Sequence, residues 1–244
     1  MPVLATSAGK PLGARIACLD WAALTDGLDK RGYATTGPLL TAAECAGLIE
    51  LYSRDNVFRS RIVMARHGYG QGEYQYFAYP LPLLVSDVRT TCYEHLVPLA
   101  NRWAEAMKLE TRYPARHGEM IARCHEAGQM RPTPLILKYG TDDYNCLHQD
   151  LYGEHLFPIQ VAFLLSRPQS DFDGGEFVLV EQRARMQSRP EVVPLVQGEA
   201  VMFAVNQRPV QEKNGPYRVT MRHGVSRIRS GNRYTMGVIF HDAT

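Results

Sequence analysis

Eight short apolar runs, separated by turn-forming residues, fill the second half of this chain and limit its fold more than any other feature. The runs are 134–139, 144–150, 157–165, 176–180, 191–195, 200–204, 217–226 and 233–240. Glycine-containing breaks such as Gly174-Gly175 and Ser230-Gly231-Asn232 divide them. Apolar runs of this length, bounded by such residues, are typical of β-strands. Eight strands at this spacing predict a two-sheet roll or barrel.

The first half of the chain predicts helices. Thr41 and Glu44 have the spacing of a capping box, in which each residue's side chain binds the other's backbone N–H at a helix N-terminus. A longer helix is expected from about 84 to 110, and Pro98 is the point at which that helix would kink or split. These segments indicate a helical layer that precedes the strands.

Together the patterns predict a single domain spanning 1–244, of the α+β class and mainly β. Residues 1–15, rich in Gly, Pro and Ala, are expected to form a loose lead-in. Helices and substrate loops at about 16–125 should pack on one sheet of a β core at about 130–244. His241-Asp242 follows the last predicted strand, where we expect a tail.

Composition narrows the class of protein. Of 244 residues, 45% are hydrophobic and 21% charged, which is typical of a globular protein that buries a sizeable core. A net charge of +2 permits a polyanionic partner without requiring one. Five widely spaced cysteines without a CxxC pair argue against a disulfide framework or a structural zinc site.

The sequence contains neither the apolar core of a signal peptide nor an apolar run long enough to span a bilayer, so we expect a cytoplasmic protein with no membrane partner. The oligomeric state is left open.

A set of metal-ligating residue types lies within the predicted strands. His148 and Asp150 alternate on one strand, so both should project to one face while Gln149 points away. His223, from a later strand, supplies a third ligand. Two histidines and one carboxylate are the ligands of non-haem Fe(II) oxygenases, with coordination positions left open for reactants. Taken alone, the HxD pair is equally compatible with a surface strand.

An arginine follows this set at the start of the last predicted strand. The planar, permanently charged guanidinium of Arg233 is suited to a two-point clamp on a carboxylate. Thr235 shares its strand face and could donate a further hydrogen bond. Tyr139, on the first predicted strand, could place a phenol near the same carboxylate. The order of these residues predicts an anion site beside the metal.

The stretch from 139 to 240 resembles the Fe(II)/2-oxoglutarate-dependent dioxygenases, especially the branch similar to prolyl 4-hydroxylases. The matching pieces are Tyr139-Gly140, His148-Gln149-Asp150, Asp173-Gly174-Gly175-Glu176, Pro194, Gly198-Glu199-Ala200, His223-Gly224-Val225 and Gly231-Asn232-Arg233-Tyr234. A long arginine-rich segment at 207–222 departs from the pattern and leaves the shape of the substrate pocket open.

This resemblance implies a double-stranded β-helix, or jelly-roll, core and a set of cofactors. His148, Asp150 and His223 would bind Fe(II), while Arg233 and Tyr139, with Thr235 beside them, would hold the distal carboxylate of 2-oxoglutarate. With O2 as co-substrate, the implied reaction couples decarboxylation of 2-oxoglutarate to succinate with hydroxylation of a substrate C–H bond.

A second group of unusual residues occupies 58–77, where basic side chains alternate with aromatics and glycines. Arginines that contact phosphates and aromatic rings that stack on unpaired bases are typical of single-stranded nucleic-acid binding. A glycine-containing loop with solvated charges and anchoring tyrosines is the alternative interpretation. The candidate substrate residues are Arg59, Arg61, Arg66, Tyr74, Tyr76, Tyr152, His155 and Arg222.

From about 19 to 241 the chain also resembles a prokaryotic family of 2-oxoglutarate oxygenases that has been inferred to demethylate damaged nucleic-acid bases. The segments that carry this resemblance are FRSRIVMARHGYGQGEYQYF, YPLPLL and HQDLYGEHLFPIQVAFLLS. The implied partner is single-stranded or damaged nucleic acid. Two alternatives stay open: a prolyl-hydroxylase-like enzyme for a protein side chain, amino acid or small metabolite, and a non-catalytic sensor of iron and 2-oxoglutarate.

Overall fold

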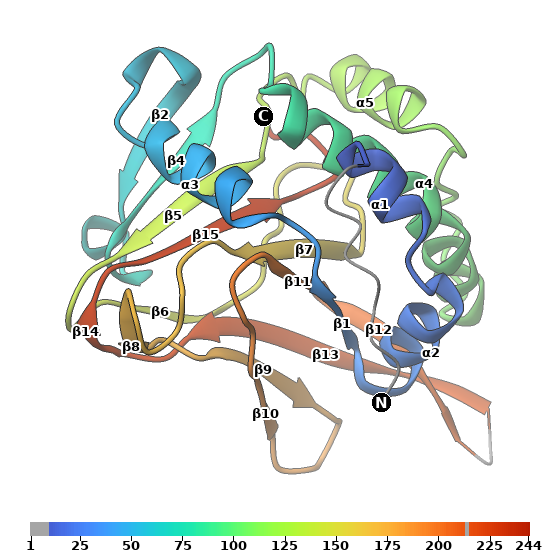
Figure 1. Cartoon of the computed structure of the whole chain (residues 1–244). Helices are drawn as coiled ribbons and strands as arrows, with labels where there is room; N and C mark the ends of the chain where they lie inside the picture. The colour runs from blue at the N-terminus through green and yellow to red at the C-terminus, as the bar shows by residue number, and fades with distance from the viewer. Residues whose placement is uncertain (1–9, 213–214) are drawn as a thin grey trace.

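The computed structural model describes residues 10–212 and 215–244, and two larger antiparallel sheets dominate it (Figure 1). The larger sheet has seven strands. In order across the sheet they are β1 (Tyr33–Pro38), β11 (Glu199–Ala204), β7 (Ile159–Leu164), β15 (Arg233–Val238), β5 (Leu135–Tyr139), β4 (Glu73–Phe77) and β2 (Phe58–Val63).

The second sheet lies against the larger one, and the two sheets line a common cavity. Its path is β10 (Arg189–Val193), β9 (Phe177–Gln182), β13 (Gly215–Val225), β6 (Tyr144–His148) and β3 (Gly70–Gln71), and β12 (Gln207–Glu212) also pairs with β13. A separate two-stranded sheet joins β8 (Phe172–Gly174) to β14 (Ile228–Gly231). The predicted jelly-roll core is confirmed.

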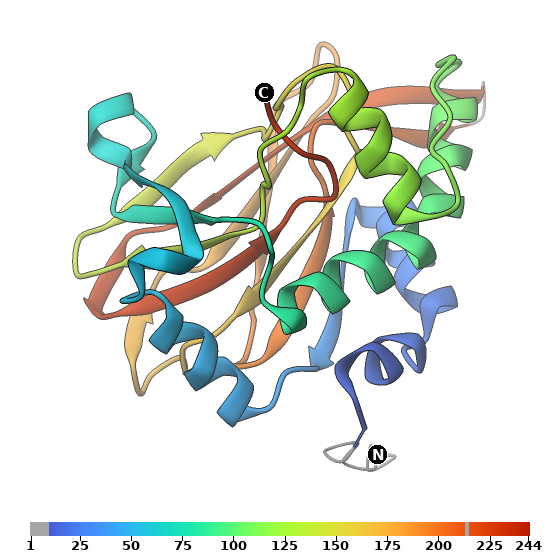
Figure 2. The ribbon, with the colours of Figure 1, turned by 90° about the horizontal axis from the view of Figure 1, so that it is seen from above.

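Helices gather on the outer side of the larger sheet, away from the second sheet (Figures 1 and 2). They are α1 (Leu12–Ala17), α2 (Trp21–Arg31), α4 (Leu83–Ala106) and α5 (His117–Glu126). Alternation along the strands explains this layer: Phe163 of β7 and Met236 of β15 point toward the helices and share one core cluster with Val88 of α4. Their neighbours Ala162 and Gly237 therefore point to the opposite face of the sheet and line the cavity.

Two helical predictions can be compared with the structure. Helix α3 (Ala42–Leu51) begins with the predicted capping box, because the Thr41 hydroxyl accepts from the Glu44 N–H and the Glu44 carboxylate accepts from the Thr41 N–H. The long helix α4 is neither split nor ended by Pro98, which lies inside its 24 residues. No helix in the described parts of the chain is both long and apolar enough to cross a membrane.

Each of the eight predicted runs overlaps a strand, but the first half of the chain was predicted too simply. It contributes β1 to one edge of the larger sheet and β4 with β2 to the other edge, besides its helices. The predicted lead-in is also partly wrong, since residues 12–17 form α1; residues 1–9 lie outside the described ones. The arginine-rich segment at 207–222 forms the β12–β13 pair.

The expected tail at the C-terminal side is wrong as well. Asp242 is fully buried and accepts hydrogen bonds from Arg89 Nη2 at 2.7 Å and from the Tyr79 hydroxyl at 2.8 Å. His125 Nε2 lies 2.9 Å from the same carboxylate. Partners more than a hundred positions earlier in the chain hold this residue inside the domain.

Candidate metal and oxoacid site

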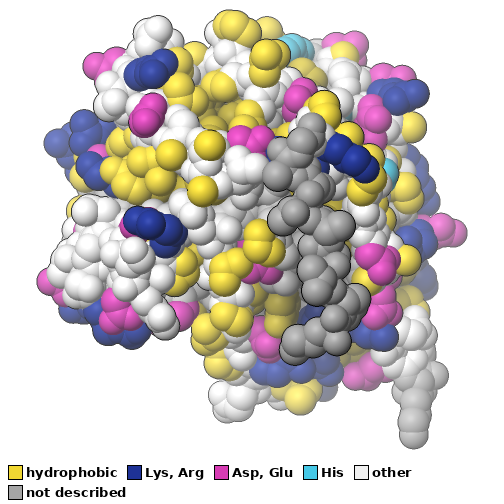
Figure 3. All heavy atoms as spheres, viewed as in Figure 1, with side chains coloured by type: hydrophobic (Ala, Val, Ile, Leu, Met, Phe, Trp, Pro, Cys, Tyr) yellow, Lys and Arg dark blue, Asp and Glu magenta, His cyan; other side chains and the backbone are white. Residues whose placement is uncertain are grey.

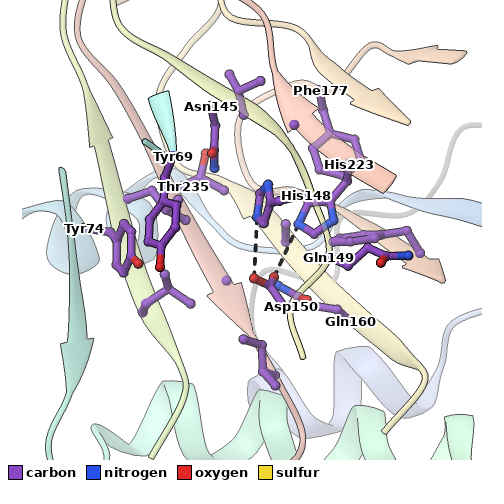
Figure 4. A pocket seen from close by; sticks show the side chains of 18 of the residues that line it. Tyr69, Tyr74, Asn145, His148, Gln149, Asp150, Gln160, Phe177, His223 and Thr235 are labelled. Carbon is purple, nitrogen blue, oxygen red and sulfur yellow. Dashed lines mark ion pairs between the residues drawn. The ribbon is translucent and has the colours of Figure 1, made fainter. Parts of the chain in front are cut away.

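A cavity of about 320 Å³ lies between the two large sheets. Alternate residues of four neighbouring strands of the larger sheet form one wall, and they are Tyr74 and Tyr76 of β4, Leu135, Leu137 and Tyr139 of β5, Arg233, Thr235 and Gly237 of β15, and Gln160 and Ala162 of β7. The second sheet supplies the facing wall, which includes Asn145, His148, Phe177 and His223 (Figure 4). Strand alternation thus places the predicted residues in one space.

His148, Asp150 and His223 meet in this cavity. His148 ends β6 and pairs directly with His223 of β13, which brings the two rings to a centroid separation of 4.2 Å. Asp150 lies two residues beyond the strand, and its carboxylate oxygens are 3.5 Å from His148 Nε2 and 3.3 Å from His223 Nε2 (Figure 4). One ligand atom from each residue lies within 4.8 Å of the others, a spacing that fits a single metal ion.

Neighbouring groups fix the protonation of this set. His148 Nδ1 lies 2.8 Å from the carbonyl oxygen of Cys146, so Nδ1 carries a proton and Nε2 is the ring nitrogen that a metal would use. Burial alone would raise the pKa of Asp150, but hydrogen bonds and charge from His148 and His223 hold it well below its ordinary value. Burial, together with the charge of His148, lowers the pKa of His223. An anionic carboxylate between two imidazoles is a donor set that suits Fe(II).

Arg233 occupies the other end of the cavity and is only 1% exposed. Its Nη1 donates to Thr235 Oγ1 at 2.6 Å, and its guanidinium lies 5.7 Å from the centre of the Tyr139 ring. None of the ion pairs among the described residues includes it, and Glu176 is already held by Ser226 and Arg229. Burial lowers the pKa of Arg233 to about 10. A buried cation without a protein counter-ion suits a carboxylate ligand.

Missing hydrogen-bond partners concentrate around the cavity. Within the described residues, eight buried side-chain polar atoms have no partner, and three of them belong to residues that line this space. These are Arg233 Nε, His223 Nδ1 and Gln160 Oε1. Because buried polar groups are nearly always paired in folded proteins, this concentration indicates a place where ligands complete the structure.

The predicted substrate residues divide into two groups. Tyr74, Tyr76 and Tyr152 line the cavity, and the Tyr152 hydroxyl donates to Asp150 Oδ1 at 2.8 Å. Arg59 does not line it but lies 4.4 Å over the ring of Tyr76, with Nε donating to the Pro132 carbonyl at 2.9 Å.

The other four residues are not brought to the cavity. Arg61 pairs with Glu73, Arg66 is exposed on η2 (Met64–His67), and Arg222 is exposed on β13 beside the inward-facing His223. The backbone of His155 is bound by Gln129, and its ring is not part of the cavity wall.

Sequence reasoning did not single out several polar residues of the cavity, among them Tyr69, Asn145 and Gln160, and Gln149, which was predicted to point away, lines it as well. Tyr69 lies at its mouth, and the Asn145 amide donates to the Tyr139 hydroxyl at 3.3 Å. Gln160 interrupts the apolar run FPIQVAFLL, and a single polar residue in such a run was a usable signal, because it has to find a partner inside the protein.

The bond from Tyr152 to Asp150 predicts a role in metal affinity. Tyr152→Phe should weaken Fe(II) binding about 10-fold or more, because one carboxylate oxygen loses the partner that orients it. Anaerobic Fe(II) titration against a competing chelator measures this. Tyr144→Phe, on β6 but outside the cavity wall, serves as the matched control. Equal affinities for the two variants would show that the hydrogen bond does not orient the ligand.

Comparison with known proteins agrees with this geometry. Residues 72–243 match the model of a family described as an oxygenase catalysing oxidative methylation of damaged DNA. A protein of Mycobacterium tuberculosis, Rv2227 in strain H37Rv and MT2286 in strain CDC 1551, is 48% identical over 167 residues, which span 68% of this chain and 72% of the relative.

Solved structures agree in fold. A Pseudomonas putida prolyl-4-hydroxylase superposes with a TM-score of 0.53 at 15% identity, over 92% of this chain and 99% of that one. A 2-oxoglutarate/Fe(II) oxygenase family oxidoreductase from Burkholderia pseudomallei gives 0.54 at 15% identity, over 92% and 93%. Since the family model spans most of the sequence, the chain belongs to this family of oxygenases.

Proposed function

We propose that this protein is an Fe(II)- and 2-oxoglutarate-dependent dioxygenase that removes methyl groups from bases of single-stranded or damaged nucleic acid. His148, Asp150 and His223 would hold the iron, and Arg233, Thr235 and Tyr139 would hold the distal carboxylate of 2-oxoglutarate. When bound, iron with 2-oxoglutarate and O2 supplies the means to insert one oxygen atom into a C–H bond, with release of succinate and carbon dioxide.

The observation that carries this proposal is the buried, unpaired Arg233 in the cavity that contains the three ligands. A guanidinium without a counter-ion costs stability, so its retention beside a metal-binding set supports a ligand with a carboxylate at that end. Thr235 and Tyr139 add two hydroxyl groups on the same wall. A five-carbon oxoacid with carboxylates at both ends could then reach from the clamp to the iron.

The chain's own residues orient the reactants and exclude water. The Cys146 carbonyl fixes the tautomer of His148, and Tyr152 fixes one oxygen of Asp150. Phe177 and Phe203 pack against His223 at centroid distances of 6.1 and 4.7 Å, which keeps solvent from that side of the ligand set. If the oxidised carbon is an N-methyl group, the hydroxymethyl product loses formaldehyde and the base regains its N–H.

The mouth of the cavity supports a nucleic-acid substrate. Tyr69 is 49% exposed there, and His67 stacks on it at 5.3 Å with an angle of 21° between the rings. Leu151, which also lines the cavity, is 46% exposed. Exposed rings beside a deep pocket suit stacking of the bases that flank an extruded one. The family description points to DNA as the substrate class.

The charge distribution favours the second candidate, hydroxylation of a protein side chain, an amino acid or a small metabolite. Arg61, which the sequence suggested for a phosphate contact, is paired with Glu73, and the exposed Arg227 and Arg229 are paired with Asp142 and Asp173. On the face shown in Figure 3, Lys and Arg side chains alternate with Asp and Glu and do not form a continuous basic surface. A nucleic-acid binder usually has a more basic surface.

Turnover with defined substrates tests the proposal. The wild type should form succinate in the presence of Fe(II) and 2-oxoglutarate, and release formaldehyde from single-stranded oligonucleotides that carry N-methylated bases. His148→Ala should abolish both products, whereas His155→Ala, outside the cavity wall, should retain them. Gain of one oxygen on a peptide or amino acid, without formaldehyde from any oligonucleotide, would assign the second candidate. Binding of 2-oxoglutarate without any succinate would assign the sensor.

A further inference from the structure

Gln160 is a buried amide whose partner is not found among the described residues. It lies on β7, between β11 and β15 in the larger sheet, and is 4% exposed. Its Oε1 has no hydrogen-bond partner, although the side chain points into the cavity. A polar side chain in a strand buried on both faces costs stability unless something binds it. The missing partner must therefore come from whatever enters the cavity.

Strand register places Gln160 at the end of the cavity opposite the oxoacid clamp. Arg233 pairs with Tyr139, and four residues further along β15 Gly237 pairs with Ala162 of β7. Gln160 lies two residues before Ala162, which in this antiparallel pair is further from Arg233. The backbone positions of Arg233 and Gln160 are thus six residues apart, or about 20 Å along the strands at ~3.3 Å per residue. Gln160 and Asp150 both line the cavity and are both labelled in Figure 4.

The two ends of the cavity suit ligands of different chemistry. The end with Arg233 offers a cation and hydroxyl groups, which suit a carboxylate. The end with Gln160 offers an uncharged amide, which suits a neutral group that carries an N–H donor or a carbonyl. A molecule bound to Gln160 would therefore occupy a part of the cavity that the Arg233 clamp does not.

Aromatic rings define the shape of the space at this end. Tyr74 and Tyr76 meet edge to face at 5.3 Å, and Tyr76 and Tyr152 do so at 6.4 Å. On the same wall, Gly237 and Ala162 pair with each other and contribute only the smallest side chains. The perpendicular tyrosine rings and the small side chains of Gly237 and Ala162 leave room for a flat ligand ring. The edge of that ring would point toward the larger sheet.

We propose that Gln160 is the specificity-determining residue for the substrate, and that its carboxamide hydrogen-bonds the polar edge of a planar nucleobase. A glutamine amide can bind an adjacent donor and acceptor on a base at the same time. This inference rests on the proposed function. It extends that function by naming the part of the base that is recognised, its polar edge, and the side chain that recognises it, Gln160. It separates base recognition by Gln160 from co-substrate recognition by Arg233.

Competition among methylated bases tests this inference. The probes are single-stranded oligonucleotides that each carry one N-methylated adenine, cytosine, guanine or thymine, and formaldehyde release gives kcat/KM for each. Gln160→Met keeps the length of the side chain and removes the amide. It should lower kcat/KM for the preferred base about 10-fold or more and reduce the differences among the four bases. The KM for 2-oxoglutarate should stay the same, because the clamp is at the other end.

Gln75→Leu is the matched control. Gln75 is a buried glutamine on β4 of the same sheet, but its amide donates to the Tyr52 carbonyl at 2.8 Å and does not reach the cavity. This variant should lower the melting temperature without changing the order of the four bases. Gln160→Met should not lower the melting temperature, since the amide it removes has an unpartnered oxygen.

The outcomes separate the inference from the function on which it rests. If the wild type releases formaldehyde and Gln160→Met keeps the same order and rates among the bases, the role of Gln160 is overturned while the demethylase proposal stands. If the wild type forms succinate but releases formaldehyde from none of the four oligonucleotides, both fall. Loss of discrimination in Gln160→Met, with an unchanged KM for 2-oxoglutarate, supports the inference.

Discussion

Arg233→Met should raise the KM for 2-oxoglutarate by about 30-fold to several thousand-fold, and should make the ligand-free protein more stable. The first effect follows because truncating one partner of a buried, hydrogen-bonded charge pair costs about 2–5 kcal/mol of binding. The second follows because Arg233 is buried and pairs with no carboxylate of the described chain. Methionine fills similar space without a buried charge, so the melting temperature of the ligand-free protein should rise.

Two measurements check this pair of effects. Succinate formation as a function of 2-oxoglutarate concentration gives the KM, and thermal unfolding without ligand gives the melting temperature. Arg233→Lys keeps a positive charge but loses the planar fork, so its KM should fall between those of the wild type and Arg233→Met. A KM that is the same in all three proteins would mean that 2-oxoglutarate binds elsewhere.

Asp242→Ala should lower the free energy of unfolding by about 3–5 kcal/mol at neutral pH. Removing this carboxylate leaves the buried guanidinium of Arg89 without its counter-ion, which is the costly way to break a buried pair. The Tyr79 hydroxyl and His125 lose a partner at the same time. Urea unfolding of the two proteins measures the difference. Asp173→Ala removes an exposed pair with Arg229 and should leave the midpoint nearly unchanged.

The pH dependence of that difference has a definite sign. Burial alone would raise the pKa of Asp242, but the charge and hydrogen bonds of Arg89 outweigh burial and hold it below the ordinary 3.8. A carboxyl with a lowered folded pKa contributes stability above its unfolded pKa, and that contribution is lost as the pH falls through the folded pKa. The gap between the wild type and Asp242→Ala should therefore be full at pH 6 and shrink below about pH 4. A gap that does not change with pH would show that the charge of Asp242 is not what stabilises the domain.

The parts of the fold that were predictable are those with a local signal. Strands β7 and β11 are mostly apolar, apart from Gln160 and Glu199, because both of their faces are buried, and such runs can be recognised in the sequence. Strands β2 and β4 are rich in charged residues and tyrosine, and they pair with each other and with β5. Their strand structure depends on those distant partners, so the first half of the chain indicated only helices and loops.

The candidate site likewise has residues that the sequence could identify and residues that only the tertiary structure could place. The spacing of His148 and Asp150, and the order of His223 and Arg233 after them, are local properties, and the structure brings all four to one cavity. Arg61 and Arg222 could not be placed, because residue type says nothing about which acids lie nearby or which face of a strand turns outward. Asp242 was misjudged for a related reason: only tertiary contacts with Arg89 reveal that a polar residue after the last strand is buried.

The central place of β15 has a consequence for how the protein is made. This strand lies between β7 and β5, so until the ribosome has released residues 233–238 the larger sheet exists as two unjoined halves. Arg233 arrives on that same strand, after His148, Asp150 and His223 have been synthesised. A nascent polypeptide could thus possess all three proposed metal ligands and yet lack the arginine that we propose to hold the oxoacid. Oxygen activation would then be withheld from incomplete chains by the order of translation.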